Sequence, residues 1–155
     1  MGKYTATVAD HLILPACVRV TPGREQELRL LGQSVPAPVA IRMLIDTGSK
    51  RTTLIPGILR HLQTMPGGQA RVHTAAGEVA TELSWVCLEF PETGLAAFPE
   101  VLVARLPMPP ALSQFHGLFG RDLLRRLASF EYEGQRGCYT LRDRPGLFGG
   151  LRRWL

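Results

Sequence analysis

Short apolar runs recur along the chain, and glycine, proline or polar residues bound each of them. Runs of this length that are rich in β-branched and aliphatic residues are typical of strands. The pattern predicts strands over residues 13–21, 26–31, 37–45, 51–55, 71–90 (a hairpin that turns at Ala76-Gly77), 98–105, 130–133 and 138–142. Polar or glycine-rich turns are expected at 23–27 and 65–68.

Helical signals are few. Pro56 suits the first turn of a short helix that ends at Leu62, and a second helix is expected from Arg121 to about Ala128. Many short strands with little helix predict an all-β, barrel-like fold. We expect a loosely ordered lead over 1–12, one folded domain over 13–143 and a basic tail over 144–155.

Composition agrees with one ordinary globular domain, since 45% of the 155 residues are hydrophobic and 20% are charged. Three widely spaced cysteines argue against a disulfide framework and favour small apolar core positions. The N-terminus does not resemble a signal peptide, and no apolar run would cross a bilayer, so a soluble, cytoplasmic protein is expected. Most of the net charge of +5 lies near the C-terminus. Because the rest of the chain lacks a basic patch, we expect neither a nucleic-acid nor a membrane partner.

One segment places a carboxylate directly after an apolar strand. The run Leu44-Ile45-Asp46-Thr47-Gly48-Ser49 follows the apolar stretch 38–45, and a β pattern resumes at Thr52. Asp also favours ordinary turns, so the motif alone is weak. A second segment adds weight, because Gly117-Leu118-Phe119-Gly120-Arg121-Asp122-Leu123-Leu124 follows some tens of residues later.

Together the two segments resemble the retropepsin-type aspartic proteases, the retroviral family and its cellular and bacterial single-DTG relatives. The resemblance covers roughly residues 18–143. It implies a closed all-β barrel with one short helix in the C-terminal half and one lobe per chain. It also implies an aspartic endopeptidase that needs no cofactor or metal ion.

The resemblance assigns roles to individual residues. Asp46 matches the catalytic aspartate, and Thr47, Gly48 and Ser49 complete the active-site loop. Ala75, Ala76 and Gly77 match the tip of a flap that closes over bound peptide. Pocket-lining positions fall on Leu44, Lys50, Arg51, His116 and Leu118, and the second motif supplies Gly120, Arg121 and Asp122.

The chemistry of the family requires two carboxylates about 3 Å apart that share one proton, so that one acts as base and the other as acid. This chain has four aspartates and a single Asp-Thr-Gly. A two-lobed arrangement within one chain is therefore excluded, and a homodimer in which each subunit contributes Asp46 is expected. The other partner is a peptide or protein substrate.

Two departures from the family pattern leave an alternative open. Lys50 and Arg51 stand where acidic residues are usual. Asp122 is expected to pair with one of these two residues. The substrate is expected to carry acidic or neutral side chains near the site. The flap has one glycine, Gly77. The alternative is a catalytically weak or inactive module of the same fold that dimerises or binds peptides. We also expect the Ser49 hydroxyl to donate to the Asp46 carboxylate, which would favour an acidic working range.

Overall fold

The computed structural model describes residues 1–8 and 10–144. Strands predominate in this part of the chain: β1 (Lys3–Thr7), β2 (Ile13–Arg19), β3 (Val39–Ile45), β4 (Thr53–Leu54), β5 (Met65–Thr74), β6 (Gly77–Phe90), β7 (Leu95–Arg105), β8 (Gly117–Phe119), β9 (Ser129–Glu133) and β10 (Cys138–Arg142). The helices are α1 (Pro22–Leu30), α2 (Pro56–Leu62), α3 (Arg121–Leu124) and the 3₁₀ turn η1 (Pro110–Leu112). None of the helices in these residues is long and apolar enough to span a membrane.

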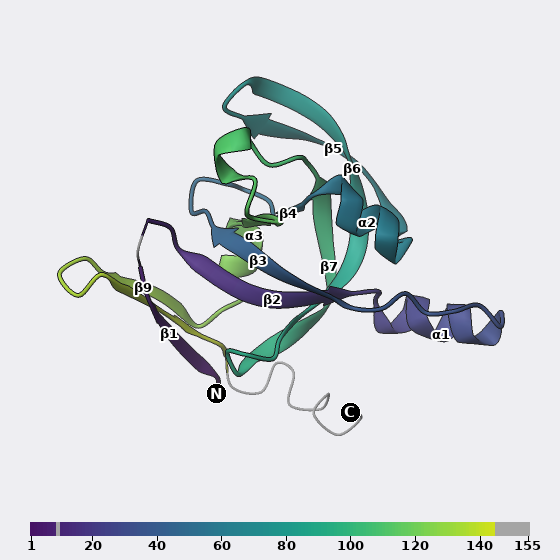
Figure 1. Cartoon of the computed structure of the whole chain (residues 1–155), viewed down its shortest axis with the longest axis horizontal. Helices are drawn as coiled ribbons and strands as arrows, with labels where there is room; N and C mark the ends of the chain where they lie inside the picture. The colour runs from purple at the N-terminus through teal and green to yellow at the C-terminus, as the bar shows by residue number, and fades with distance from the viewer. Residues whose placement is uncertain (9, 145–155) are drawn as a thin grey trace.

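Six strands close into a barrel. The larger sheet has the order β2-β3-β8-β4-β7-β6-β5, and β2 also pairs with β6, so β5 lies outside the closed ring (Figure 1). The pairs β3–β8 and β4–β7 are parallel, and the other pairs of this sheet are antiparallel. The expectation of a closed all-β barrel with a short helix in the C-terminal half is confirmed.

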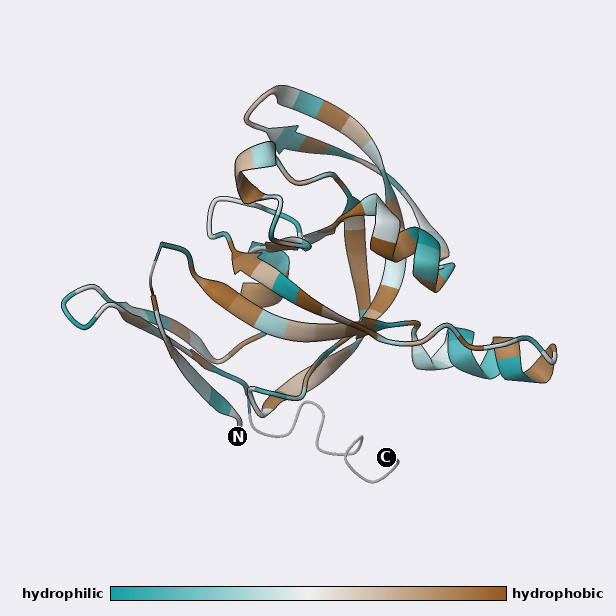
Figure 2. Ribbon diagram, in the orientation of Figure 1, coloured by the Kyte–Doolittle hydropathy of each residue, from teal (hydrophilic) through white to brown (hydrophobic). Residues whose placement is uncertain are grey.

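The barrel interior is filled by alternate strand residues, because successive side chains of a strand point to opposite faces. In β2 the buried positions are Leu14, Ala16 and Val18. Three phenylalanines add an aromatic cluster, in which the rings of Phe90 and Phe98 lie 5.8 Å apart and those of Phe90 and Phe119 lie 6.2 Å apart. Figure 2 shows this distribution, with hydrophobic residues along the barrel strands and a largely hydrophilic α1.

The ends of the described chain form a second, smaller sheet with the order β1-β10-β9. The expectation of a loosely ordered lead over residues 1–12 is therefore wrong for Lys3–Thr7. Tyr4 packs edge-on against Tyr139 with the ring centroids 6.0 Å apart, and the Tyr139 hydroxyl donates to the carbonyl of Ile13 in the barrel. These contacts anchor the small sheet to β2.

A buried carboxylate fixes the first residues of the chain to the barrel as well. Asp143 is 8% exposed and accepts hydrogen bonds from the backbone N–H of Gly2 at 2.5 Å and of Ala96 at 2.8 Å. A Cβ atom at Gly2 would collide with the carbonyl oxygen of Gly94. The start of β1, the end of β10 and the start of β7 therefore meet at one point.

The predicted turn at 23–27 and strand at 26–31 are wrong, because helix α1 occupies both. The Thr21 hydroxyl caps this helix by accepting from the N–H of Arg24 at 3.3 Å, and Pro22 occupies its first turn. Glu25 pairs with Arg29 one turn later, at 2.7 Å. These local signals outweigh the three leucines at positions 28, 30 and 31, of which only Leu28 is buried.

Other boundaries differ by smaller amounts. The predicted turn at 65–68 is instead the start of β5, where an irregularity in the pairing between Pro66 and Gln69 accommodates the two glycines. Helix α3 ends at Leu124, short of the predicted end near Ala128. The basic tail predicted over 144–155 lies, apart from Arg144, outside the described residues.

Candidate active site

Asp46 lies on the tight loop that follows β3. Its N–H donates to the carbonyl of Phe119 at 3.1 Å, and its own carbonyl accepts from the N–H of Ser49 at 3.2 Å. Its carboxylate oxygen Oδ1 accepts from the N–H of Gly48 at 2.9 Å. The Asp46 side chain is half-buried, whereas Thr47 and Gly48 are exposed, so the loop presents its carboxylate to the surface in a fixed orientation.

Parallel pairing of β3 with β8 brings the two sequence motifs together. Leu44 pairs with Leu118, and Ile45 pairs with Phe119. Gly117 and Gly120 permit a close approach on the other side of β8, to the backbone of residues 51–53 that leads into β4. A Cβ atom at Gly117 would collide with the carbonyl of Thr53, and one at Gly120 would lie 2.7 Å from the backbone carbon of Arg51.

A buried polar network holds the end of the loop against α3. Thr52 is fully buried, and its hydroxyl donates to Asp122 at 2.8 Å while accepting from the N–H of Gly120 at 3.1 Å. Asp122 also accepts from the backbone N–H groups of Thr52 and Leu123, each at 2.9 Å. The expected pairing of Asp122 with Lys50 or Arg51 is therefore wrong, because Asp122 binds Thr52 and the start of its own helix.

Thr52 is the residue that the motif analysis missed. It stands 70 positions from Asp122 in sequence, and nothing in its neighbours signals the contact. Arg121 also contributes through its backbone, since its N–H donates to the carbonyl of Ser49 at 2.9 Å. Its buried Nε has no hydrogen-bond partner among the described residues.

The Ser49 hydroxyl does not bond to the catalytic candidate. It donates to the carbonyl of Arg51 at 2.8 Å. The expected bond to the Asp46 carboxylate is wrong, because the loop directs this hydroxyl back to its own backbone. Ser49 thus stabilises the loop.

The predicted flap corresponds to the tip of the β5–β6 hairpin. Thr74 closes the turn, because its hydroxyl donates to the carbonyl of Gly77 at 2.9 Å and accepts from the N–H of Ala76 at 3.2 Å. Gly77 has a φ of 114°, a value that residues with a side chain rarely adopt. Ala75, Ala76 and Gly77 are all exposed. No hydrogen bond among the described residues joins this tip to the Asp46 loop.

The predicted pocket residues divide into two groups. Leu44 and Leu118 are half-buried neighbours in β3 and β8, and Lys50 is exposed beside the Asp46 loop. His116 lies elsewhere. It lines a groove of about 520 Å³ whose lining residues include none of Asp46, Leu44 or Leu118.

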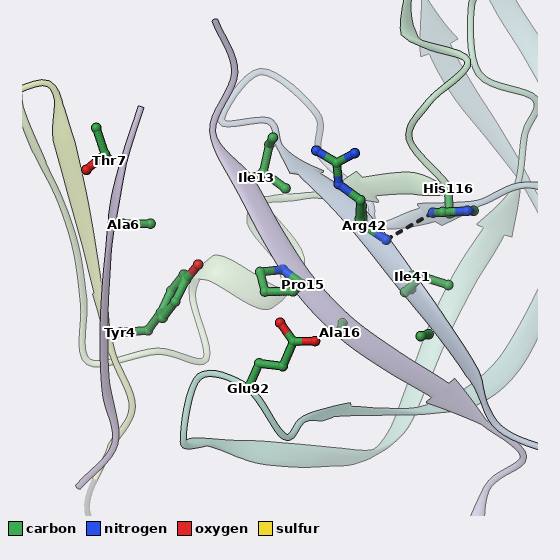
Figure 3. A pocket seen from close by; sticks show the side chains of 11 residues that line it. Tyr4, Ala6, Thr7, Ile13, Pro15, Ala16, Ile41, Arg42, Glu92 and His116 are labelled. Carbon is green, nitrogen blue, oxygen red and sulfur yellow. Dashed lines mark hydrogen bonds between the residues drawn. The ribbon is translucent and has the colours of Figure 1, made fainter. Parts of the chain in front are cut away.

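Figure 3 shows that groove, which lies between β1 and the β2–β3 edge of the barrel. The N–H of Arg42 donates to Nδ1 of His116 at 2.9 Å, so the imidazole is held against β3. Tyr4 and Ala6 line the groove from β1, opposite Pro15 of β2. Among residues 1–8 and 10–144, no group of three His, Cys, Asp or Glu side chains is placed to hold a metal ion.

Comparison with solved structures identifies the fold. No family model and no curated protein matches the sequence. Among solved structures, the chain resembles a retropepsin-like aspartic protease from Rickettsia conorii with a TM-score of 0.56 and 13% sequence identity, over 92% of this chain and 90% of that one. The likeness spans nearly the whole of both chains, and at this identity it defines the fold alone. The chain therefore has the fold of the retropepsin-like aspartic proteases.

Proposed function

We propose that this protein is a homodimeric aspartic endopeptidase in which each subunit contributes Asp46. The observation that carries the proposal is the Asp46 loop, which holds a solvent-reaching carboxylate rigidly between β3 and α3. Rigid presentation matters because catalytic groups must be held close to their productive geometry. The likeness to a protease of the same fold supports this reading.

Two Asp46 carboxylates about 3 Å apart would share one proton. The ionised carboxylate removes a proton from a water molecule as that water attacks the scissile carbonyl carbon. The protonated carboxyl donates its proton to the carbonyl oxygen, giving a neutral tetrahedral diol. Collapse of the diol breaks the C–N bond, while a carboxyl proton passes to the leaving nitrogen and the other carboxylate takes a proton from a diol hydroxyl.

The surrounding residues have supporting roles in this proposal. Thr47 joins the two loops across the dimer axis, and Gly48 allows close approach of the substrate backbone. The β5–β6 hairpin, with Gly77 at its tip, closes over an extended peptide and excludes water. Leu44 and Leu118 provide apolar walls.

The charge beside the site favours a substrate with acidic or neutral side chains. Lys50 and Arg51 form no ion pair with an acidic residue in the described part of the chain. Their positive charge is therefore available to a carboxylate of the substrate. A basic side chain at the same place would be repelled.

The test is hydrolysis of a labelled protein substrate across an acidic-to-neutral pH series. We expect wild-type protein to cleave it and Asp46→Asn to be inactive, because the change is nearly isosteric but removes the ionisable pair. Asp10→Asn is the matched control, since Asp10 is an exposed aspartate outside both motifs. Pure, folded Asp46→Asn that retained cleavage would overturn the assignment. A wild-type protein that bound peptides without cleaving them would favour the binding module instead.

A further inference from the structure

We propose that the groove between β1 and β2 binds an extended peptide, which adds to the free edge of β1 as a further strand. The groove has a volume of about 520 Å³, and its lining residues come mainly from β1, β2 and β3. Asp46 and the tip of the β5–β6 hairpin are not among them. The site is therefore separate from the candidate active site, and the proposal does not depend on the proposed function.

The backbone of β1 offers unused hydrogen-bonding groups to this groove. Among the described residues β1 pairs with β10 alone, along one edge. The N–H of Val8 donates to the carbonyl of Gly137, its partner in the same register. Hydrogen-bonded pairs alternate along an antiparallel ladder, so the even-numbered residues of β1 bond to β10. The N–H and C=O groups of Lys3, Thr5 and Thr7 therefore point to the other edge, which faces the groove.

The facing edge of β2 cannot satisfy these groups. β2 pairs with β6 only from Cys17 onward, which leaves Ile13 and Pro15 on the side of the groove. Pro15 has no N–H, and the carbonyl of Ile13 already accepts from the Tyr139 hydroxyl. A strand edge with unpaired N–H and C=O groups is a template for another strand. An extended peptide supplies the missing partners, because its main chain can pair with the exposed edge.

The shape of the groove suits a strand with alternating side chains. Figure 3 shows the side chains of Tyr4 and Ala6 pointing from β1 into the groove. Residues directly opposite each other in an antiparallel pair project on the same face. Peptide residues opposite Tyr4 and Ala6 therefore point into the groove. Those opposite Lys3, Thr5 and Thr7 exchange backbone hydrogen bonds and point away, as the exposed side chains of these three residues do.

Charges of opposite sign stand at the two ends of the groove. Figure 3 shows Arg42 at the end marked by Ile13, and Glu92 at the end marked by Tyr4. Both side chains are exposed, and neither forms an ion pair within the described part of the chain. The Arg42 guanidinium lies over the Phe115 ring, 5.7 Å from its centroid, which favours one position of the charge. A complementary peptide carries an acidic residue at the Arg42 end and a basic residue at the Glu92 end.

These charges fix the direction of the peptide. β1 runs from Tyr4, at the Glu92 end, to Thr7, at the Arg42 end. Antiparallel pairing is more stable per residue than parallel pairing. The acidic residue of the peptide therefore precedes the basic one.

The probe is a blocked, fluorescently labelled heptapeptide, Glu-Thr-Val-Thr-Val-Thr-Lys. Paired antiparallel, its threonines lie opposite Thr7, Thr5 and Lys3, and its valines lie opposite Ala6 and Tyr4. Its terminal glutamate and lysine extend past the ends of β1 towards the two charges of the groove. Fluorescence anisotropy with the full chain should show saturable binding. The reversed-order peptide, Lys-Thr-Val-Thr-Val-Thr-Glu, should bind about fivefold more weakly or worse.

A charge swap in the protein tests the same contacts from the other side. The double variant Arg42→Glu/Glu92→Arg should bind the reversed-order peptide more tightly than the original one. Arg60→Gln is the matched control, because Arg60 is an exposed arginine on α2 that does not line the groove. Far-UV circular dichroism and thermal melting confirm that each variant is folded. A folded double variant that kept the wild-type preference would overturn the proposal.

Methylated peptides test the backbone pairing without changing the protein. N-methyl groups on the threonines of the probe remove N–H groups that face β1, whereas N-methyl groups on the valines remove N–H groups that face away. The first peptide should bind about tenfold more weakly than the second. In nuclear magnetic resonance spectra of the complex, the amide protons of Lys3, Thr5 and Thr7 should exchange more slowly than in the free protein. Equal binding by the two methylated peptides, or unchanged exchange at these amides, would contradict strand addition.

Asp46→Asn separates this site from the proposed function. This variant should bind the heptapeptide as tightly as wild type does, whether or not wild-type protein is a protease. Wild-type protein that cleaves substrate but shows no saturable binding of the heptapeptide would keep the protease assignment and remove this site. A peptide that only dissociates pairs of copies, without slowing exchange in β1, would assign the groove to a second copy and overturn the proposal.

Discussion

Thr52→Val tests whether the buried network beneath the Asp46 loop holds this loop in place. Valine has nearly the same shape as threonine, so packing is preserved while the hydroxyl is lost. Two bonds then disappear: the donation to Asp122 at 2.8 Å and the acceptance from the N–H of Gly120 at 3.1 Å. Asp122 keeps its backbone donors, but the N–H of Gly120 is left buried without this partner.

Removing the Thr52 hydroxyl should lower the free energy of unfolding by a large amount for the loss of one polar atom. A hydrogen bond to a charged group contributes about 1.5–3 kcal/mol, and an unsatisfied buried donor costs about 1–3 kcal/mol. Because the two terms share one site they do not add fully, so we expect a loss of about 2–4 kcal/mol. For a domain of this size that corresponds to a fall in Tm of about 4–16 °C.

Urea unfolding at fixed pH measures this loss directly. Thr7→Val is the control, because Thr7 is exposed and its substitution should change the unfolding free energy by less than about 0.5 kcal/mol. A Thr52→Val protein with the stability of this control would refute the structural role of the network. If Thr52 acts through Asp122, the double variant Thr52→Val/Asp122→Asn should lose less than the sum of the single losses.

Two further predictions concern backbone crowding and a buried thiol. Gly120→Ala should lower the free energy of unfolding in urea by about 1–3 kcal/mol, because the new Cβ atom would lie 2.7 Å from the backbone carbonyl carbon of Arg51. Gly23→Ala is the control, since a Cβ atom at Gly23 meets nothing within 4 Å. Equal stability of the two variants would contradict the crowding at Gly120. Burial, assisted by Glu89, raises the pKa of the Cys87 thiol to about 12 from the ordinary 9.0. The folded protein thus holds the Cys87 proton more tightly than the unfolded chain does. The protonated thiol therefore favours the folded state fully below pH 9.0, and this contribution to the free energy of unfolding is lost as pH rises from 9.0 towards 12. Unfolding followed against pH should show a shallower alkaline decline in Cys87→Ala, and an unchanged decline would exclude this thiol as a cause.

The barrel was predictable because its strands carry their own signals. The apolar run before Asp46 is a local feature that marks β3, and the second motif includes β8, which the structure pairs with β3 beside the candidate site. Helix α1 was not predicted although Thr21, Pro22 and the Glu25–Arg29 spacing mark it, because the leucines at positions 28, 30 and 31 resemble a short apolar strand.

Contacts between distant segments carried no such signal. The Thr52–Asp122 bond spans 70 positions, and the two residues look ordinary in their own surroundings. The strand character of Lys3–Thr7 depends on β10, which provides both the hydrogen bonds and the apolar face. The direction of the Ser49 hydroxyl is set by loop geometry that residue types alone do not specify.

The pairing of β1 with β10 also affects the order in which the molecule can assemble during synthesis. β1 is synthesised before every other described strand, and its partner β10 is synthesised after all of them. Closing so long a loop is entropically slow compared with forming local hairpins. The small sheet should therefore form last, after the barrel.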